Sequence, residues 1–311
     1  MPKKFLCMIV LLFGYLLFHP QTALASAREG LLLWYHCVLP VVFPFLFLSS
    51  LALRLISAED LPKAFTRPFI KLFGCSAYGA FVIPAGFLCG FPMGAKLTGD
   101  LYRDEKITQE EARRLFGFAN NLSPGFIISY LAAEQMRQPE QSGWFVFQIL
   151  GAAFLYGWAQ AWSCRGKLHL QEPQTHSERK ILSFALIDDC IYGAMESALR
   201  LGAYIVLFAI LSGAILQIAP ISNPAILLLV SGIEVTNGIR LLAASSLPEG
   251  GKYIAVSALA AFGGLSALAQ SAGIAHMDKK MLFYYIKSRV IITLLTILIS
   301  AVVFFLLRVM P

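Results

Sequence analysis

The segment CGFPMGAK at residues 89–96 restricts the possible folds of this chain more than any other feature. It places two glycines and a proline inside an apolar stretch that is long enough to enter a lipid bilayer, and Lys96 ends it. Such a break is tolerated at membrane depth only where protein or a water-filled cavity covers its free peptide groups. A second interrupted segment, GIEVTNG at 232–238, lies in the other half of the chain. Paired interruptions of this kind indicate the binding site of a membrane transporter.

Composition indicates that the chain is surrounded by lipid. The 311 residues are 58% hydrophobic and 14% charged, with a mean hydropathy of +0.69, whereas soluble domains carry roughly 25% charged residues. Apolar stretches near the roughly 20 residues needed to cross a bilayer lie at 5–25, 30–56, 74–97, 113–133, 143–163, 192–218, 223–247, 253–275 and 283–307. We therefore predict an all-α polytopic protein of the cell membrane, with membrane lipid as a partner. Its scattered basic residues argue against nucleic acid.

The distribution of lysine and arginine predicts an orientation. We place the amino terminus in the cytoplasm and treat 74–97 and 223–247 as re-entrant hairpins, which enter and leave the membrane on one side. Eighteen Lys and Arg residues then face the cytoplasm, among them Lys106, Lys280 and Arg289. Four face outside, namely Arg28, Arg137, Lys252 and Arg308. The positive-inside rule favours this arrangement, in which the first hairpin opens inward and the second outward.

The amino-terminal segment has a second interpretation. Two lysines, an apolar core and ALASA at 23–27 also fit a cleavable secretory signal, so residues 1–27 are either an anchor helix or a signal. The six cysteines show no CxxC spacing, which argues against a disulfide framework and against structural zinc.

A short internal repeat predicts two inverted halves. Each half has an apolar span, an interrupted hairpin and a helix with a small and polar kink, FANNLSPGFI at 118–127 and FGGLSALAQSAGI at 262–274. Chance similarity between apolar segments is the alternative. The predicted division is the segment 1–27, a first repeat with one additional helix at 28–163, a cytoplasmic linker and surface helix at 164–191, a second repeat at 192–275, and a carboxy-terminal transmembrane helix at 276–311. A further amphipathic helix is predicted from Thr108, with Glu111 as its capping-box partner.

The four motifs, in this order, resemble the YlbJ-type sporulation integral membrane proteins of endospore formers, a branch of the Gate, or nucleoside-recognition, domain family. The two kinked helices also resemble those of concentrative nucleoside transporters. The resemblance covers roughly 28–275 and implies two Gate-like repeats that move a small polar solute across a membrane. For this branch it implies a role in supplying dipicolinic acid to the developing spore, in a membrane around the forespore.

The predicted solute-binding residues are the polar and break-forming residues of the four motifs. They are Gly90, Pro92, Lys96, Asn120, Asn121, Ser123, Glu234, Thr236, Asn237, Ser266 and Gln270. Pro124 removes a backbone donor and frees a carbonyl near the asparagines, although asparagines also join helices. A carboxylate at Glu234 costs about 2.5–3.5 kcal/mol in lipid unless it faces water or a partner. Glu234 could therefore bind the solute or form a structural pair with Arg240, and the sequence leaves both roles open.

The remaining candidates carry similar alternatives. Ser266 and Gln270 are four residues apart and share a helix face, where Gln270 either binds solute or joins two helices. Lys96 either attracts an anionic solute, helped by the positive end of a broken helix, or extends towards the membrane interface.

No catalytic pattern is present. The sequence has no HExxH, GxSxG or P-loop motif, so we predict no enzyme, no catalytic residue, no metal and no cofactor. A coupling ion and a homo-oligomer are left open. The favoured function is movement of a small-molecule solute, preferably an organic anion such as dipicolinic acid. The alternatives are a nucleoside or other metabolite as solute, and a non-transporting scaffold or assembly factor in sporulation.

Overall fold

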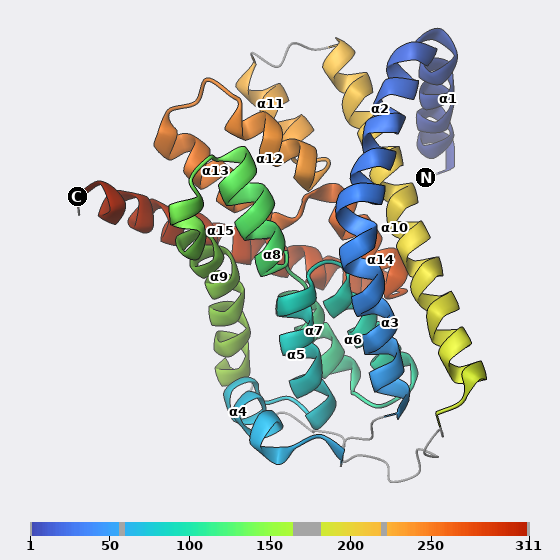
Figure 1. Cartoon of the computed structure of the whole chain (residues 1–311). Helices are drawn as coiled ribbons and strands as arrows, with labels where there is room; N and C mark the ends of the chain where they lie inside the picture. The colour runs from blue at the N-terminus through green and yellow to red at the C-terminus, as the bar shows by residue number, and fades with distance from the viewer. Residues whose placement is uncertain (1, 56–59, 164–181, 219–222, 310–311) are drawn as a thin grey trace.

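The computed structural model describes residues 2–55, 60–163, 182–218 and 223–309, and all its regular elements in these ranges are helices (Figure 1). In chain order they are α1 (Pro2–Phe18), α2 (Pro20–Leu33), the π-helix η1 (Trp34–Val38), α3 (Leu39–Leu55), α4 (Lys63–Phe73), α5 (Ala77–Cys89), α6 (Met93–Arg103), α7 (Gln109–Phe118), α8 (Pro124–Phe126), the π-helix η3 (Ile127–Gln135), the 3₁₀-helix η4 (Pro139–Gln141), α9 (Ser142–Ser163), α10 (Phe184–Ile218), α11 (Pro224–Ser231), α12 (Val235–Ala243), α13 (Glu249–Phe262), α14 (Gly264–Ile274) and α15 (Lys279–Val309).

Within the described residues, three helical segments are long and apolar enough to cross a membrane. They are Phe184–Gln217 of α10, Glu249–Ile274 of α13 and α14, and Lys279–Arg308 of α15. Helices α4 and α5 meet the same criterion together but bend by 88°. The predicted class, a helical membrane protein, is confirmed at this level. Fewer segments qualify than the nine apolar stretches because several stretches are broken into short helices; the inverted repeats and the membrane entry of the hairpins remain predictions.

The amino-terminal helices divide at a different place from the predicted one. The break falls at His19, between α1 and α2, and α2 then continues through η1 into α3. Pro20 occupies the first turn of α2, a position that suits proline because its missing N–H has no helical partner there. The boundary predicted at 27/28 therefore lies inside α2, which packs along α10 with Gly30 against Ala209.

Helix α10 also differs from the prediction. It is continuous from Phe184 to Ile218, so no separate surface helix ends at residue 191. Asp188 and Asp189 lie exposed in its first turns, and Asp189 pairs with Arg54 at 3.4 Å. A mainly apolar run without proline follows them, and its glycines do not interrupt it, so the helix continues to Ile218. Residues 164–181 of the predicted linker and surface helix at 164–191 lie outside the described residues.

Helix breaks occur at all four predicted motifs. The first hairpin motif separates α5 from α6, and the second separates α11 from α12, with the helices of each pair in contact. Residues 119–123 separate α7 from α8, and Gly263, with φ of 88°, separates α13 from α14. The interruptions are thus features of the fold.

Helix α7 begins as predicted, but its capping acid has another role. The Thr108 hydroxyl accepts a hydrogen bond from the Glu111 N–H at 3.2 Å. The Glu111 carboxylate does not return to Thr108; it is fully buried and accepts from the Ser76 N–H at 2.7 Å. Burial raises the pKa of the Glu111 carboxyl, while the Ser76 N–H and the Arg114 guanidinium oppose that rise. Glu111 therefore ties α7 to the start of α5.

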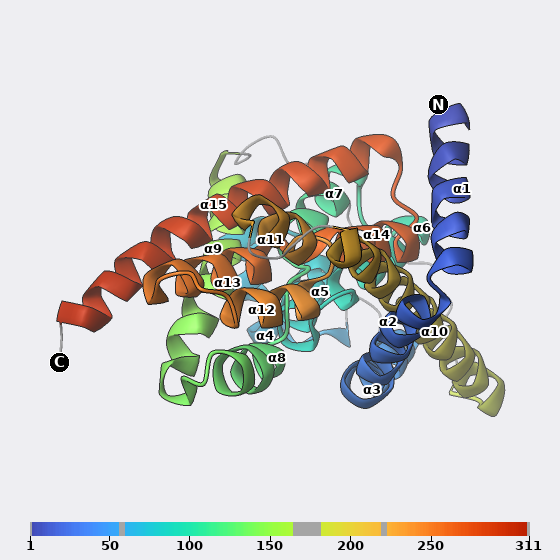
Figure 2. The same cartoon turned by 90° about the horizontal axis from the view of Figure 1, so that it is seen from above.

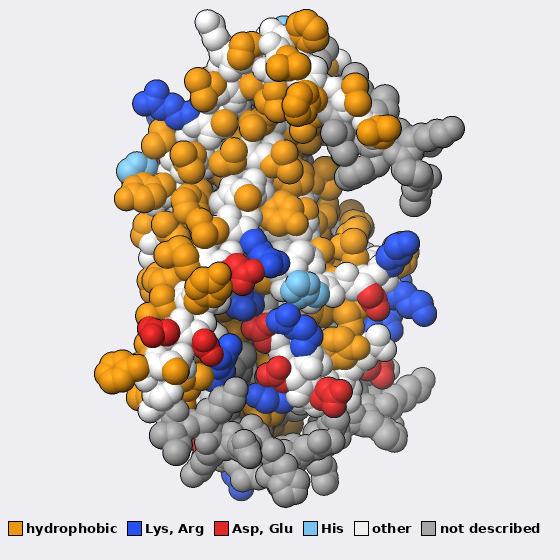
Figure 3. Space-filling model, turned by 90° about the vertical axis from the view of Figure 1, so that its right-hand side faces the viewer, with side chains coloured by type: hydrophobic (Ala, Val, Ile, Leu, Met, Phe, Trp, Pro, Cys, Tyr) orange, Lys and Arg blue, Asp and Glu red, His pale blue; other side chains and the backbone are white. Residues whose placement is uncertain are grey.

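Helix α15 joins the two halves of the chain. It runs crosswise to α10 in Figures 1 and 2 and packs against α7, α9 and α13. On the face shown in Figure 3, hydrophobic side chains cover most of the upper part, whereas Lys, Arg, Asp and Glu gather over the lower part. An apolar surface next to a charged one suits a protein that contacts both lipid and water.

Candidate solute-binding site

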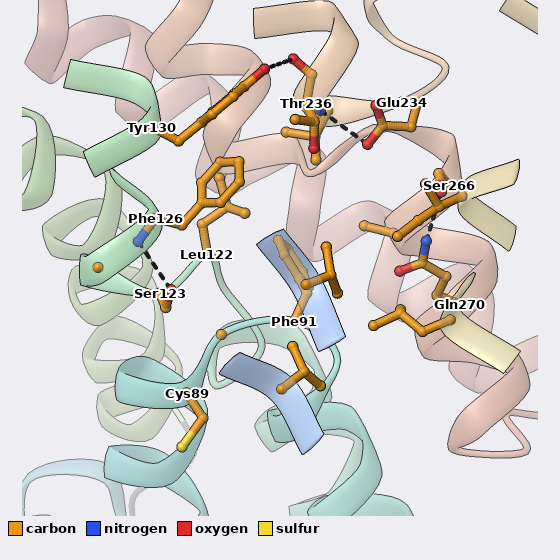
Figure 4. Close-up of a pocket in the computed structure, with 18 of the residues that line it drawn as sticks. Cys89, Phe91, Leu122, Ser123, Phe126, Tyr130, Glu234, Thr236, Ser266 and Gln270 are labelled. Atoms are coloured by element: carbon orange, nitrogen blue, oxygen red, sulfur yellow. Dashed lines mark hydrogen bonds between the residues drawn. The ribbon is translucent and has the colours of Figure 1, made fainter. Parts of the chain in front are cut away.

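The four helix breaks surround a cavity of about 630 Å³. Its wall is formed by η1 and α3, the first hairpin break, residues 122–134, α10, the start of α12, and α14 (Figure 4). Six of the predicted solute-binding residues line it, namely Gly90, Ser123, Glu234, Thr236, Ser266 and Gln270. Residues from both halves of the chain are thus brought to one cavity.

Gly90 and Ser123 bring the first hairpin against the first kink. Gly90 has φ of 84°, and a Cβ atom there would lie 2.8 Å from the Ser123 backbone nitrogen. The Ser123 hydroxyl caps α8 by accepting from the Phe126 N–H at 3.2 Å. The close approach requires glycine at 90, both for space and for the backbone conformation.

Glu234 caps helix α12 at the wall of the cavity. Its carboxylate accepts hydrogen bonds from the N–H groups of Thr236, at 3.0 Å, and Asn237, at 2.8 Å. Arg240 does not form the alternative pair with Glu234; it donates to Asn237 Oδ1 at 3.1 Å and lies 3.6 Å from Glu29. Glu234 is 3% exposed, and backbone donors rather than an arginine satisfy it.

Ser266 and Gln270 share a face of α14, as their spacing predicts. Gln270 Nε2 donates to Ser266 Oγ at 2.7 Å, and the Gln270 oxygen is directed towards the cavity in Figure 4. The Leu265 and Ser266 N–H groups donate to the carbonyls of Gly232 and Ile233 at 2.8 and 2.9 Å. These backbone bonds hold the start of α14 against the second hairpin break.

Aromatic residues that the sequence did not single out also line the cavity. The Tyr130 hydroxyl donates to the Thr236 carbonyl at 2.9 Å and so joins η3 to α12. Phe91 lies between the side chains of Leu122 and Phe126 and those of α14 (Figure 4). Aromatic residues flanking a glycine or proline break are the signal that could have indicated them.

The other five predicted residues lie outside the cavity lining. They are Pro92, Lys96, Asn120, Asn121 and Asn237. Lys96 pairs with Asp100 at 3.1 Å within α6. Asn120 accepts from the Ala95 N–H at 3.2 Å and donates to Ser271 Oγ at 2.8 Å and Tyr285 OH at 2.9 Å. These contacts join three helices, which is the alternative considered for the asparagines.

Arg289 is the functional candidate that the sequence interpretation misplaced. It was counted among the cytoplasmic basic residues, but it is fully buried in α15 and donates to Asn121 Oδ1 at 3.1 Å. Arginine was assigned to a loop because four basic residues stand close together at 279–289. Its position ten residues beyond Lys279, inside an apolar span, was the available signal, since an ionisable residue there is a functional candidate by default.

The fold and the cavity define a helical integral membrane protein with a mainly apolar cavity that carries a few polar side chains. The chain is similar to the sporulation integral membrane protein YlbJ of Bacillus subtilis (strain 168), with 27% identity over 82% of this chain and 71% of that protein. This similarity confirms the predicted resemblance to the YlbJ-type proteins. No protein-family model and no solved structure matches the chain. The Gate-domain assignment and the likeness to concentrative nucleoside transporters therefore stay predictions.

Proposed function

We propose that this protein is a transporter that moves a small polar solute through the cavity between its four helix breaks. The favoured solute is an organic anion such as dipicolinic acid, moved during spore formation across a membrane around the forespore. The observation that carries the proposal is the cavity itself, about 630 Å³ in volume, whose lining includes six of the predicted solute-binding residues, from both halves of the chain. Small-molecule sites occupy roughly 300–1,000 Å³.

The lining favours a flat solute with polar edges. Most of its side chains are apolar, including Val38, Leu122 and Leu201, while Glu234 and Gln270 provide polar groups. Apolar walls with a few placed polar groups are typical of sites that bury most of a small ligand. A planar ring with carboxyl or amide substituents matches this pattern better than a large or strongly hydrated solute does.

Recognition of an anion would depend on helix ends. Among the described residues that line the cavity there is no lysine or arginine, and Lys96 is outside it. The amino-terminal ends of α8, α12 and α14 lie at the cavity instead, and such ends favour negative charge, which at α12 the Glu234 carboxylate already supplies. An ionised Glu234 would repel a dianion, so binding of a dicarboxylate would require Glu234 protonated or neighbouring a coupling cation.

Uptake by vesicles that contain the purified protein tests the proposal. We expect saturable uptake of dipicolinate, in preference to nucleosides and simple carboxylates. Gln270→Ala should lower uptake at least tenfold, about 1.4 kcal/mol of lost interaction, because it removes a polar group from the cavity. Gln135→Ala is the matched control, since Gln135 contacts Glu134 and does not line the cavity.

Two outcomes would overturn the proposal in different ways. Preferred uptake of neutral nucleosides would show that the solute is a nucleoside and not an organic anion. Absence of saturable uptake of all tested solutes by correctly inserted protein would favour the non-transporting scaffold.

A further inference from the structure

Arg289 is a buried cation with an unusual set of partners. Its guanidinium donates to the Ala261 carbonyl at 3.2 Å, the Gly117 carbonyl at 3.0 Å and Asn121 Oδ1 at 3.1 Å. Its Nε has no partner, and no Asp or Glu of the described chain forms an ion pair with it. Burying a charge without a carboxylate partner is costly, so this arrangement needs a reason other than stability alone.

The partners of Arg289 come from the two kinked segments. Gly117 is the penultimate residue of α7 and Ala261 the penultimate residue of α13. The last carbonyls of a helix lack helical partners and carry partial negative charge. Two such helix ends therefore meet at one guanidinium, and the Asn121 amide oxygen adds a third acceptor.

This set of groups is the kind that binds a coupling cation. In transporters with broken helices, unwound carbonyls and the carboxy-terminal ends of half-helices coordinate sodium ions or protons. Here the guanidinium of Arg289 lies among three neutral oxygens of that type. The Phe91 ring, which lines the cavity, lies 5.8 Å from the guanidinium carbon. Only the Phe91 ring therefore separates the Arg289 charge from the proposed solute path.

We propose that Arg289 is a tethered cation that occupies the place of a dissolved coupling cation between the two kinked segments. It is a positioning residue: it holds the ends of α7 and α13 together without a bound metal ion. For the proposed transport function, on which this consequence rests, solute binding to the cavity requires no sodium or potassium. The structural part of the inference does not depend on the identity of the solute.

The first test compares two neighbouring asparagines. Asn121→Asp places a carboxylate beside the guanidinium but loses the bond from Asn121 Nδ2 to the Phe118 carbonyl, so we expect the melting temperature of the purified protein to change little. Asn120→Asp is the matched control, because Asn120 is equally buried but bonds to Ala95 and two hydroxyls. An unpaired buried charge there should lower the melting temperature by roughly 6–12 °C. Equal losses in both variants would overturn the proposal.

The second test removes the tethered charge. Arg289→Ala leaves the three oxygens facing a vacated space, and we expect methylguanidinium, or a sodium or potassium salt, to raise its melting temperature relative to choline chloride at equal ionic strength. A structural role through packing alone would give no such response. Unmodified protein should show the same melting temperature in all of these salts.

Solute binding supplies the last comparison. We expect dipicolinate to bind the unmodified protein equally well in sodium, potassium and choline chloride, whereas a requirement for sodium would overturn the tethered-cation proposal. If the Arg289→Ala protein does not accumulate, the melting temperatures of the two asparagine variants alone test the tethered-cation proposal. If Asn121→Asp is stable but the protein does not bind dipicolinate, the proposed solute is wrong and the tethered-cation proposal still holds.

Discussion

At the scale of single residues, the buried polar side chains divide into two groups that look alike in the sequence. Asn120 and Asn121 bond to other helices, whereas Ser266 and Gln270 bond to each other and face the cavity. All four stand in kinked motifs with glycine or proline nearby. Residue type and spacing predict that all four lie at helix breaks. Whether such a side chain contacts another helix or faces the cavity depends on packing between segments that are distant in the sequence.

Glu234 can be tested as both a helix cap and a solute-contacting group. Glu234→Gln keeps one acceptor oxygen for the α12 N–H groups, so we expect the free energy of unfolding to fall by only about 1 kcal/mol. Glutamine also resembles a protonated carboxyl and cannot ionise. We expect the variant to take up dipicolinate with little dependence on pH, whereas uptake by the unmodified protein should fall as the pH rises and Glu234 ionises.

The control for Glu234→Gln is Glu134→Gln. Glu134 also lines the cavity, but it is exposed, so the variant should keep both the uptake and its pH dependence. Loss of uptake at every pH in a folded Glu234→Gln protein would show that a charged carboxylate, rather than a protonated one, serves the solute or its coupling ion.

At the scale of helices and breaks, two cavity glycines have opposite expected tolerances. Gly90→Ala should lower the free energy of unfolding by roughly 2–4 kcal/mol, because alanine is strained at φ of 84° and its methyl group meets Ser123. Gly125→Ala should leave stability equal or raised by up to about 1 kcal/mol, since Gly125 is helical and has no atom within 4 Å of a new Cβ. Thermal unfolding in detergent measures both; equal behaviour would contradict the close approach of the first hairpin to the first kink.

The helix breaks could be predicted from the sequence, but some helix boundaries could not. Glycine and proline at 90–92 and glycine at 263–264 act locally, so their effect can be seen in a short window of sequence. The continuation of α2 through residue 28 is accompanied by packing against the later part of α10, with Gly30 against Ala209, and the start of α10 lies beside α3, where Asp189 pairs with Arg54. Charged residues at those positions suggested loops, yet they lie on exposed faces of uninterrupted helices.

At the scale of the whole molecule, charged side chains gather over the lower part of the face shown in Figure 3. The side of the membrane that such exposed positions face can be measured by labelling introduced cysteines. In a background without the six native cysteines, we expect Asp104→Cys and Lys280→Cys to be protected from an impermeant thiol reagent applied to intact cells. Glu249→Cys should react. All three positions are exposed in the structure, so permeabilised cells should label at each of them. Labelling of the cysteine at 104 in intact cells would contradict the predicted orientation.

The contacts of α15 have a consequence for the synthesis of the protein. This helix carries Arg289 and Tyr285 to both kinked segments, and it follows every other helix of the described chain. Until residue 289 has been synthesised, the carbonyls of Gly117 and Ala261 lack the guanidinium that they contact in the folded protein. We therefore expect the ends of α7 and α13 to reach their native spacing only once α15 is in place, although a chain released just before α15 would already contain every residue that lines the cavity.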